Sequence, residues 1–148
     1  VHLIPLDWDQ THTLNATLNY SSGNKGISFI SQVGSGLSYT PESTEDISTL
    51  IQNSTKKPIT WKIDMLAYYN MRVFNQDIDF YLRVLNLFDH LNHTGVYSDT
   101  GVSDRTKYLQ QAQSQNTNEY YNTVEDWYNN ETYYSKPRYI EIGMSYAF

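Results

Sequence analysis

The chain has 148 residues, a formal net charge of −6 and a hydrophobic fraction of 39%, which suits one folded domain and excludes a disordered composition. It contains no Cys, and this excludes disulfide frameworks, thiolate zinc sites and cysteine nucleophiles. The acidic balance, without a cluster of Lys and Arg, argues against a nucleic-acid partner. No window approaches the ~20 consecutive apolar residues of a transmembrane helix.

The N-terminal part of the chain predicts a loop followed by two strands. Residues 1–10 have no sustained period, whereas residues 11–20 alternate polar side chains with His12, Leu14, Ala16, Leu18 and Tyr20. That period of two is typical of a β-strand. Residues 21–26 predict a tight turn in which the two glycines and Asn24 supply positive φ angles. A second strand is predicted over residues 27–39.

The middle of the chain predicts a long polar connection and two further strands. The connection covers residues 40–58, and the third strand covers residues 59–74. One face of that strand is apolar, and the other carries Lys62, Asp64 and Arg72, which a dry core would accept only with compensation. A turn at residues 75–77 leads into the fourth strand, residues 78–88, which again alternates apolar and polar side chains.

A second long connection, residues 89–136, precedes the closing strand, residues 137–148. Part of the connection is predicted to be helical, because Tyr120, Val124, Trp127 and Tyr128 recur at helical spacing after the candidate cap Asn118. In the closing strand one face is wholly apolar or aromatic, and the other carries Glu141, Ser145 and small residues. This pattern is typical of a transmembrane strand with a lipid face and a lumen face.

The connections run short, long, short, long, which is the alternation of periplasmic turns and external loops in outer-membrane barrels. The predicted fold class is therefore all-β, an antiparallel meander of five transmembrane strands, with external loops at residues 40–58 and 89–136. The smallest such barrels have ~8 strands, so the meander is expected to be the closing part of a larger barrel. The chain starts at Val1 without Met or a signal peptide, which indicates a mature product or a piece of a longer protein, and we favour the piece.

The chain also resembles the C-terminal end of TonB-dependent outer-membrane receptors. The resemblance lies in PLDWDQTHTLNATLNY (residues 5–20), YLRVLNLFD (81–89), YSDTG (97–101) and YYSKPRYIEIGMSYAF (133–148). It implies a barrel of about 22 strands with an N-terminal plug. The plug, which contacts the TonB energy-coupling system, would lie outside these residues.

The resemblance and the strand alternation together single out three groups of residues. The NLFD box, at the entry to the long loop, consists of Asn86, Leu87, Phe88 and Asp89. By resemblance, the barrel-assembly machinery recognises an assembly signal made of Ile140, Ile142, Met144, Tyr146 and Phe148. The candidates for facing the lumen are Lys62, Asp64, Tyr68, Arg72, Tyr81, Arg83 and Glu141. The charged members either line a solute path or pair with charges on neighbouring strands or the plug.

The resulting hypothesis is a wall segment of a receptor in the bacterial outer membrane, in contact with lipid, for energy-coupled uptake of a siderophore, cobalamin or glycan. No catalysis or cofactor is expected. No metal site is expected either, because Asp89, His90 and His93 lack a further ordered ligand in a predicted loop. The alternatives are a soluble β-sandwich or lipocalin-like binding domain and a passive porin segment. A second layer of side chains would favour the soluble alternative if it covered Trp61, Ile63, Met65, Ile142 and Met144.

Overall fold

The computed structural model describes residues 3–42, 51–74, 76–115 and 123–146 of the chain, which divides into two compact units. The first, here called the sheet unit, comprises residues 13–33, 61–91 and 136–148. The second, here called the loop unit, comprises residues 1–12, 34–60 and 92–135. The long strands belong to the sheet unit, and the α-helices belong to the loop unit.

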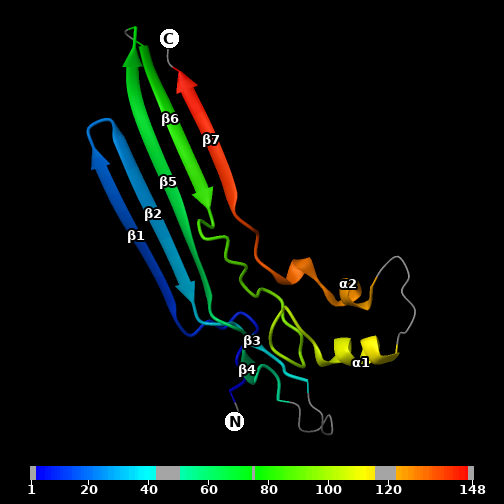
Figure 1. Cartoon of the computed structure of the whole chain (residues 1–148). Helices are drawn as coiled ribbons and strands as arrows, with labels where there is room; N and C mark the ends of the chain where they lie inside the picture. The colour runs from blue at the N-terminus through cyan, green and yellow to red at the C-terminus, as the bar shows by residue number, and fades with distance from the viewer. Residues whose placement is uncertain (1–2, 43–50, 75, 116–122, 147–148) are drawn as a thin grey trace. The chain divides into compact units, whose positions relative to one another are not determined.

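The sheet unit is a meander in which each strand lies beside the next long strand of the chain (Figure 1). Its five strands are β1 (Thr13–Ser22), β2 (Lys25–Gly34), β5 (Thr60–Val73), β6 (Gln76–Leu85) and β7 (Tyr139–Tyr146). The predominance of antiparallel sheet over helix confirms the all-β class. The sheet is open, with β1 and β7 at its edges.

The register of β5, β6 and β7 gives the sheet two chemically different faces. Met65 lies opposite Val84, which lies opposite Ile140, and the alternation continues along all three strands. The apolar face, as we define it, carries Met65, Ala67, Tyr69 and Met71 of β5, Ile78, Phe80, Leu82 and Val84 of β6, and Ile140, Ile142, Met144 and Tyr146 of β7. The polar face carries Lys62, Asp64, Tyr68, Asn70 and Arg72, then Asp77, Asp79, Tyr81 and Arg83, then Glu141 and Ser145.

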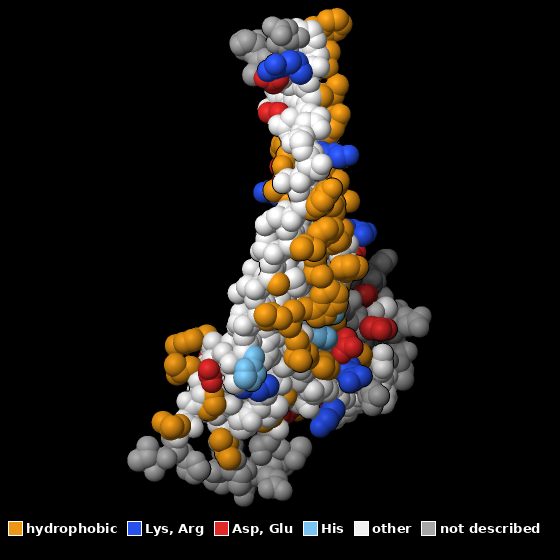
Figure 2. Space-filling view, turned by 90° about the vertical axis from the view of Figure 1, so that its left-hand side faces the viewer, with side chains coloured by type: hydrophobic (Ala, Val, Ile, Leu, Met, Phe, Trp, Pro, Cys, Tyr) orange, Lys and Arg blue, Asp and Glu red, His pale blue; other side chains and the backbone are white. Residues whose placement is uncertain are grey.

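Most side chains of the apolar face are not covered by other parts of the described structure. Val84, at 5% exposure, is the one buried hydrophobic side chain among the described residues, whereas Ile142 is 77% and Met144 is 63% exposed. Trp61, Ile63 and Met65 are half-buried. Figure 2 views the molecule from the β1 side and shows hydrophobic side chains gathered in a band along the strands. The described residues therefore place no second layer over Ile142 and Met144.

The first turn differs from its prediction because the strands are longer than expected. β1 continues to Ser22 and β2 begins at Lys25, which leaves two residues in the turn. Of the three residues expected to have positive φ, only Gly23 does, at 59°. Asn24 instead donates a side-chain hydrogen bond of 2.6 Å to the carbonyl of Asn70. At Gly26 an added Cβ would lie 2.5 Å from the ring of Tyr68, so close packing explains that glycine.

The strand predicted over residues 27–39 is wrong in its second half. β2 ends at Gly34. The N–H of Ser35 still bonds the carbonyl of His12 at 2.8 Å, but the N–H of His12 bonds the hydroxyl of Ser35 at 3.0 Å, so a side chain enters the next pair of the ladder. Farther on, β3 (Ser38–Tyr39) pairs with β4 (Thr55–Lys56) in a separate two-stranded sheet. The connection predicted over residues 40–58 therefore contains a short strand, which its polar composition did not indicate.

The remaining boundaries shift by a few residues. The turn predicted at residues 75–77 is shorter, because Gln76 and Asp77 already belong to β6, while residue 75 lies outside the described residues. β6 ends at Leu85 instead of residue 88, because Asn86 adopts a left-handed φ of 54°. The first strand begins at Thr13 instead of residue 11, and the described part of the closing strand begins at Tyr139 instead of residue 137.

The long connection over residues 89–136 contains three short helices. These are α1 (Lys107–Gln115), α2 (Val124–Tyr128) and the 3-10 helix η2 (Glu131–Tyr133). α2 confirms helical structure near Val124, but its cap is Thr123, which exchanges hydrogen bonds of 3.1 Å with Asp126 in a capping box. The expected cap Asn118, and Tyr120, lie outside the described residues.

Candidate functional site

The seven residues predicted to face a lumen all lie on the polar face, and most of them pair with one another or with a neighbouring carboxylate. Lys62 Nζ lies 3.1 Å from Asp64 Oδ2, and Arg83 bonds Glu141 Oε2 at 2.6 Å across β6 and β7. Arg72 forms a bidentate ion pair with Asp77, in which Nε and Nη2 donate to the two carboxylate oxygens at 2.8 and 3.0 Å. Because these pairs are exposed to solvent, they give the polar face a nearly balanced charge and are not a major source of stability.

Two tyrosines of the polar face cover glycines of neighbouring strands. Tyr68 and Tyr81 lie opposite each other in the register of β5 and β6. An added Cβ at Gly26 would meet the Tyr68 ring, and one at Gly143 would lie 2.2 Å from the Tyr81 ring. The Tyr81 hydroxyl also donates a 2.9 Å hydrogen bond to Glu141 Oε1. Aromatic rings that cover a glycine of the neighbouring strand help to hold the strand register.

The NLFD box forms a turn that connects three strands of the sheet unit. Asn86 and Asp89 both have left-handed backbones, with φ of 54° and 55°. The Asn86 side chain donates to the carbonyls of His90 and Lys136, at 3.0 and 3.2 Å, and accepts from the N–H of His90. The Asp89 carboxylate accepts a 2.7 Å hydrogen bond from the N–H of Arg138. The box therefore fixes the main chain immediately before β7.

The two apolar members of the box pack toward β5. Leu87 donates its N–H to the carbonyl of Ile63 at 2.7 Å, which extends the β5 contact beyond the end of β6. The ring of Phe88 lies 6.1 Å from that of Trp61. Trp61 also stacks on His90, with ring centroids 4.3 Å apart and 17° between the planes. The box thus has a structural role that its sequence did not disclose.

The residues considered as metal ligands have other partners. Asp89 accepts from Arg138, and His90 stacks on Trp61. His93 accepts a 3.0 Å hydrogen bond from the N–H of Ser103 through Nδ1. Among the residues that the structure describes, no group of three or more His, Cys, Asp or Glu side chains is placed to hold a metal ion.

Four of the five assembly-signal residues lie on the apolar face of β7. Ile140, Ile142, Met144 and Tyr146 stand opposite Val84, Leu82, Phe80 and Ile78 of β6. The fifth, Phe148, lies outside the described residues. Among the described residues, no further strand pairs with the outer edge of β7, so its main chain is available to one.

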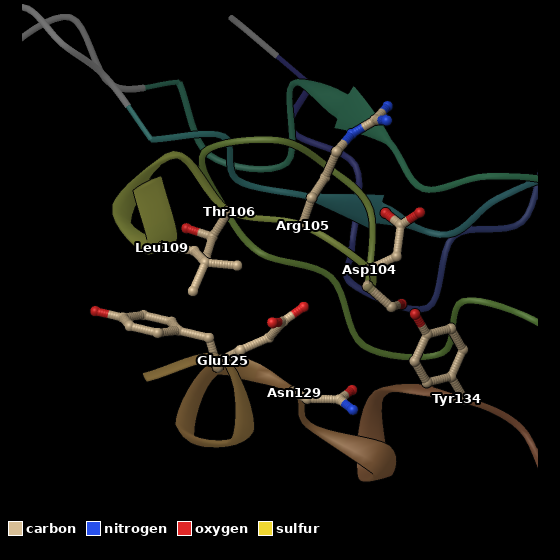
Figure 3. Close-up of a pocket in the computed structure, with 9 residues that line it drawn as sticks. Asp104, Arg105, Thr106, Leu109, Glu125, Asn129 and Tyr134 are labelled. Atoms are coloured by element: carbon tan, nitrogen blue, oxygen red, sulfur yellow. The ribbon is translucent and has the colours of Figure 1, made fainter. Parts of the chain in front are cut away.

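The loop unit holds a pocket of about 180 Å³ that the sequence did not predict (Figure 3). In Figure 3 the labelled side chains of Leu109, Glu125, Asn129 and Tyr134 surround this space, from α1, from α2 and from the segments beside α2 and η2. Asp104, Arg105 and Thr106 contribute to the wall from the chain before α1. Burial raises the pKa of Tyr134 above its usual value, and the carboxylate of Asp104 adds to this shift.

Ser103, which also lines this pocket, is 2% exposed and fixes its segment of the chain by hydrogen bonds. Its hydroxyl donates to the carbonyls of Gly95 and Tyr133, at 2.5 and 3.2 Å. Tyr97 packs edge-on against Tyr133, with ring centroids 5.1 Å apart, and burial raises the pKa of Tyr97. The two ends of the connection are therefore joined at its base, and the pocket residues depend on that closure for their positions.

Comparison of the chain with protein-family models, with curated proteins and with solved structures finds no match. No helix in the described part of the chain is long and apolar enough to cross a membrane.

Proposed function

We propose that this chain is a wall segment of a TonB-dependent outer-membrane receptor, which takes up a scarce solute by energy-coupled transport. In this proposal the meander is part of a barrel of about 22 strands, the apolar face contacts lipid and the polar face lines the lumen. The barrel-assembly machinery acts on β7, and the energy-coupling system acts through a plug outside these residues. The solute is of the siderophore, cobalamin or glycan class.

The observation that carries the proposal is the pairing of an exposed apolar face with a polar face on one sheet. A soluble sandwich buries its apolar face against a second sheet, whereas Ile142 and Met144 are exposed among the described residues. Arg83 and Glu141 form an ion pair on the other face, where the proposal places water. A lipid-facing strand requires this alternation, because lipid contacts one side and water the other.

Strand length and sheet edges give further support. The five long strands have 8 to 14 residues, and about 9–11 tilted residues cross the hydrocarbon layer. The sheet has two edges, at β1 and β7, which a closed barrel would pair with further strands. Five strands fall short of the ~8 needed for closure, so the proposal requires strands beyond those described.

Membrane fractionation of cells that express the full-length protein tests the location. The expected result is recovery in the outer membrane, and recovery in the soluble fraction would favour the soluble binding domain. Solute uptake with and without an intact energy-coupling system then separates the active receptor from a passive porin. Uptake that persists without energy coupling would contradict the receptor and support the porin.

A further inference from the structure

A second pocket lies within the sheet unit, where β6 ends and β7 begins. Its volume is about 510 Å³, within the ~300–1,000 Å³ typical of small-molecule sites. The loop-unit pocket, at about 180 Å³, falls below that range. The walls of the larger pocket consist of Lys62, Leu85, Asn86, Lys136, Pro137, Arg138 and Tyr139.

Three of these residues are cations, and two of the three have no counter-charge among the described residues. Lys62 is paired with Asp64 at 3.1 Å, but the described ion pairs do not include Lys136 or Arg138. Their main chains are nevertheless held, because the carbonyl of Lys136 accepts from Asn86 and the N–H of Arg138 donates to Asp89. The backbone is therefore fixed by the NLFD box, while both cationic head groups remain available to a ligand.

The rest of the lining is mainly apolar. Leu85 and Tyr139 lie opposite each other in the β6–β7 register, on the same face as Arg83 and Glu141. Pro137 lies between the two unpaired cations and adds a rigid apolar surface. The pocket thus opens on the polar face of the sheet, on the opposite side from Ile140 and Ile142.

We propose that this pocket binds a soluble anion with a small flat apolar body, such as an aryl phosphate or aryl carboxylate. The anionic group would contact Lys136 and Arg138, and the apolar body would pack against Leu85, Pro137 and Tyr139. A neutral polyol would leave two cations without a counter-charge, and inorganic phosphate would leave the apolar walls empty. Position on the polar face favours a water-soluble ligand over a lipid headgroup. The inference adds a binding site to the proposed function and does not require transport to occur.

Calorimetric titration of the full-length protein, folded in neutral maltoside micelles, tests the site with three probes. Phenyl phosphate carries both chemical features, inorganic phosphate carries only the charge, and phenyl glucoside carries only the ring. Phenyl phosphate is expected to bind at least about tenfold more tightly than either of the others, because charged hydrogen bonds and ring burial each contribute. Equal affinity for all three probes, or no binding of phenyl phosphate, would overturn the proposal.

Substitutions locate the binding. The double variant Lys136→Gln/Arg138→Gln should weaken phenyl phosphate binding by about tenfold or more, since each removed charge contributes a charge-assisted hydrogen bond. Lys25→Gln, which removes an exposed charge on β2 outside the pocket, is the matched control and should bind as the wild type does. The swap Lys136→Arg/Arg138→Lys keeps both charges and should retain most of the affinity. Circular dichroism verifies that each variant keeps its strand content. Wild-type affinity in the double Gln variant would overturn the proposal.

An experiment in lipid bilayers distinguishes the two sources of an anionic group, which are a soluble ligand and a lipid headgroup. The full-length protein is reconstituted in nanodiscs of phosphatidylcholine with and without phosphatidic acid, and phenyl phosphate is titrated into both. The proposal expects similar affinity in the two bilayers. Competition by phosphatidic acid that disappears in the double Gln variant would overturn the assignment to a soluble ligand.

Discussion

The carboxylate of Asp64 accepts a hydrogen bond of 2.8 Å from the backbone N–H of Asn86. This contact ties β5 to the residue at which the chain leaves β6. Asn86 is 6% exposed and has a left-handed backbone, and its side chain bonds the main chain on both sides of the long connection. Asp64 and Asn86 together therefore determine where β6 ends and where the chain returns to form β7.

Replacement of this asparagine should destabilise the sheet unit. Asn86→Ala removes three side-chain hydrogen bonds. Alanine also tolerates the positive φ at this position less well than asparagine does. The expected loss in the free energy of unfolding is about 2–4 kcal/mol, measured by urea titration in micelles. Asn86→Gly loses the same hydrogen bonds but tolerates the backbone, so it should be about 1 kcal/mol less destabilised than Asn86→Ala. Wild-type stability in both variants would show that the box is not structural.

Two half-buried tyrosines of the loop unit, Tyr97 and Tyr134, predict a loss of structure at alkaline pH. Burial raises the pKa of Tyr97 and of Tyr134, so folding favours their protonated forms. This contribution is complete below the ordinary tyrosine pKa of ~10 and disappears as pH rises through the raised values. Near-ultraviolet circular dichroism should therefore weaken above about pH 10. Tyr134→Phe keeps the ring without the titrating group and should reduce the loss, whereas Tyr20→Phe, at an exposed position, should not. An unchanged alkaline loss in Tyr134→Phe would contradict the argument.

The isolated chain should not behave as a soluble monomer. Its β1 and β7 edges and the exposed side chains of the apolar face are a template for association. We expect aggregation in plain buffer and dispersion when detergent is added, measured by light scattering. A monodisperse monomer that melts cooperatively in plain buffer would contradict the membrane proposal.

The assembly signal is tested in the full-length protein by deletion of Phe148. If that residue is part of the signal, its deletion should sharply reduce the amount of protein in the outer membrane. An aromatic residue that only contacts lipid at the rim contributes about 1 kcal/mol or less, so its deletion would change the amount little. Glu141→Gln is the matched control in the same strand, because it breaks the ion pair with Arg83 on the polar face. Equal amounts of wild type, deletion and control would remove the signal assignment.

Strand positions were predictable from sequence wherever alternation was strong. The alternation of residues 59–74 predicted β5 to within one residue at each end, since its side chains alternate between a polar and an apolar face. Alternation could not predict the end of β2 at Gly34, because there the hydroxyl of Ser35 accepts from the N–H of His12, which is distant in the sequence. α1 was missed because its sequence, KYLQQAQSQ, has few apolar residues to mark a buried face.

Candidate site residues were predictable only within regular strands. The seven lumen candidates share the polar face, because a period of two fixes the face once the strand is known. Both pockets lie beside connections whose conformation depends on contacts between distant residues, such as Asn86 with Lys136. No local pattern in the sequence carries that information.

Site-directed labelling of β7 tests the membrane proposal most directly. The chain has no Cys, so single-Cys variants at Glu141, Ile142, Met144 and Ser145 can each carry one spin label, once any Cys elsewhere in the full-length protein has been replaced by Ser. In membranes that contain the full-length protein, labels at Ile142 and Met144 should respond to oxygen dissolved in the bilayer, and labels at Glu141 and Ser145 to a water-soluble relaxation agent. That alternation is the result the account predicts. Equal access of the water-soluble agent to all four positions, or protection of Ile142 and Met144 from both agents, would contradict it.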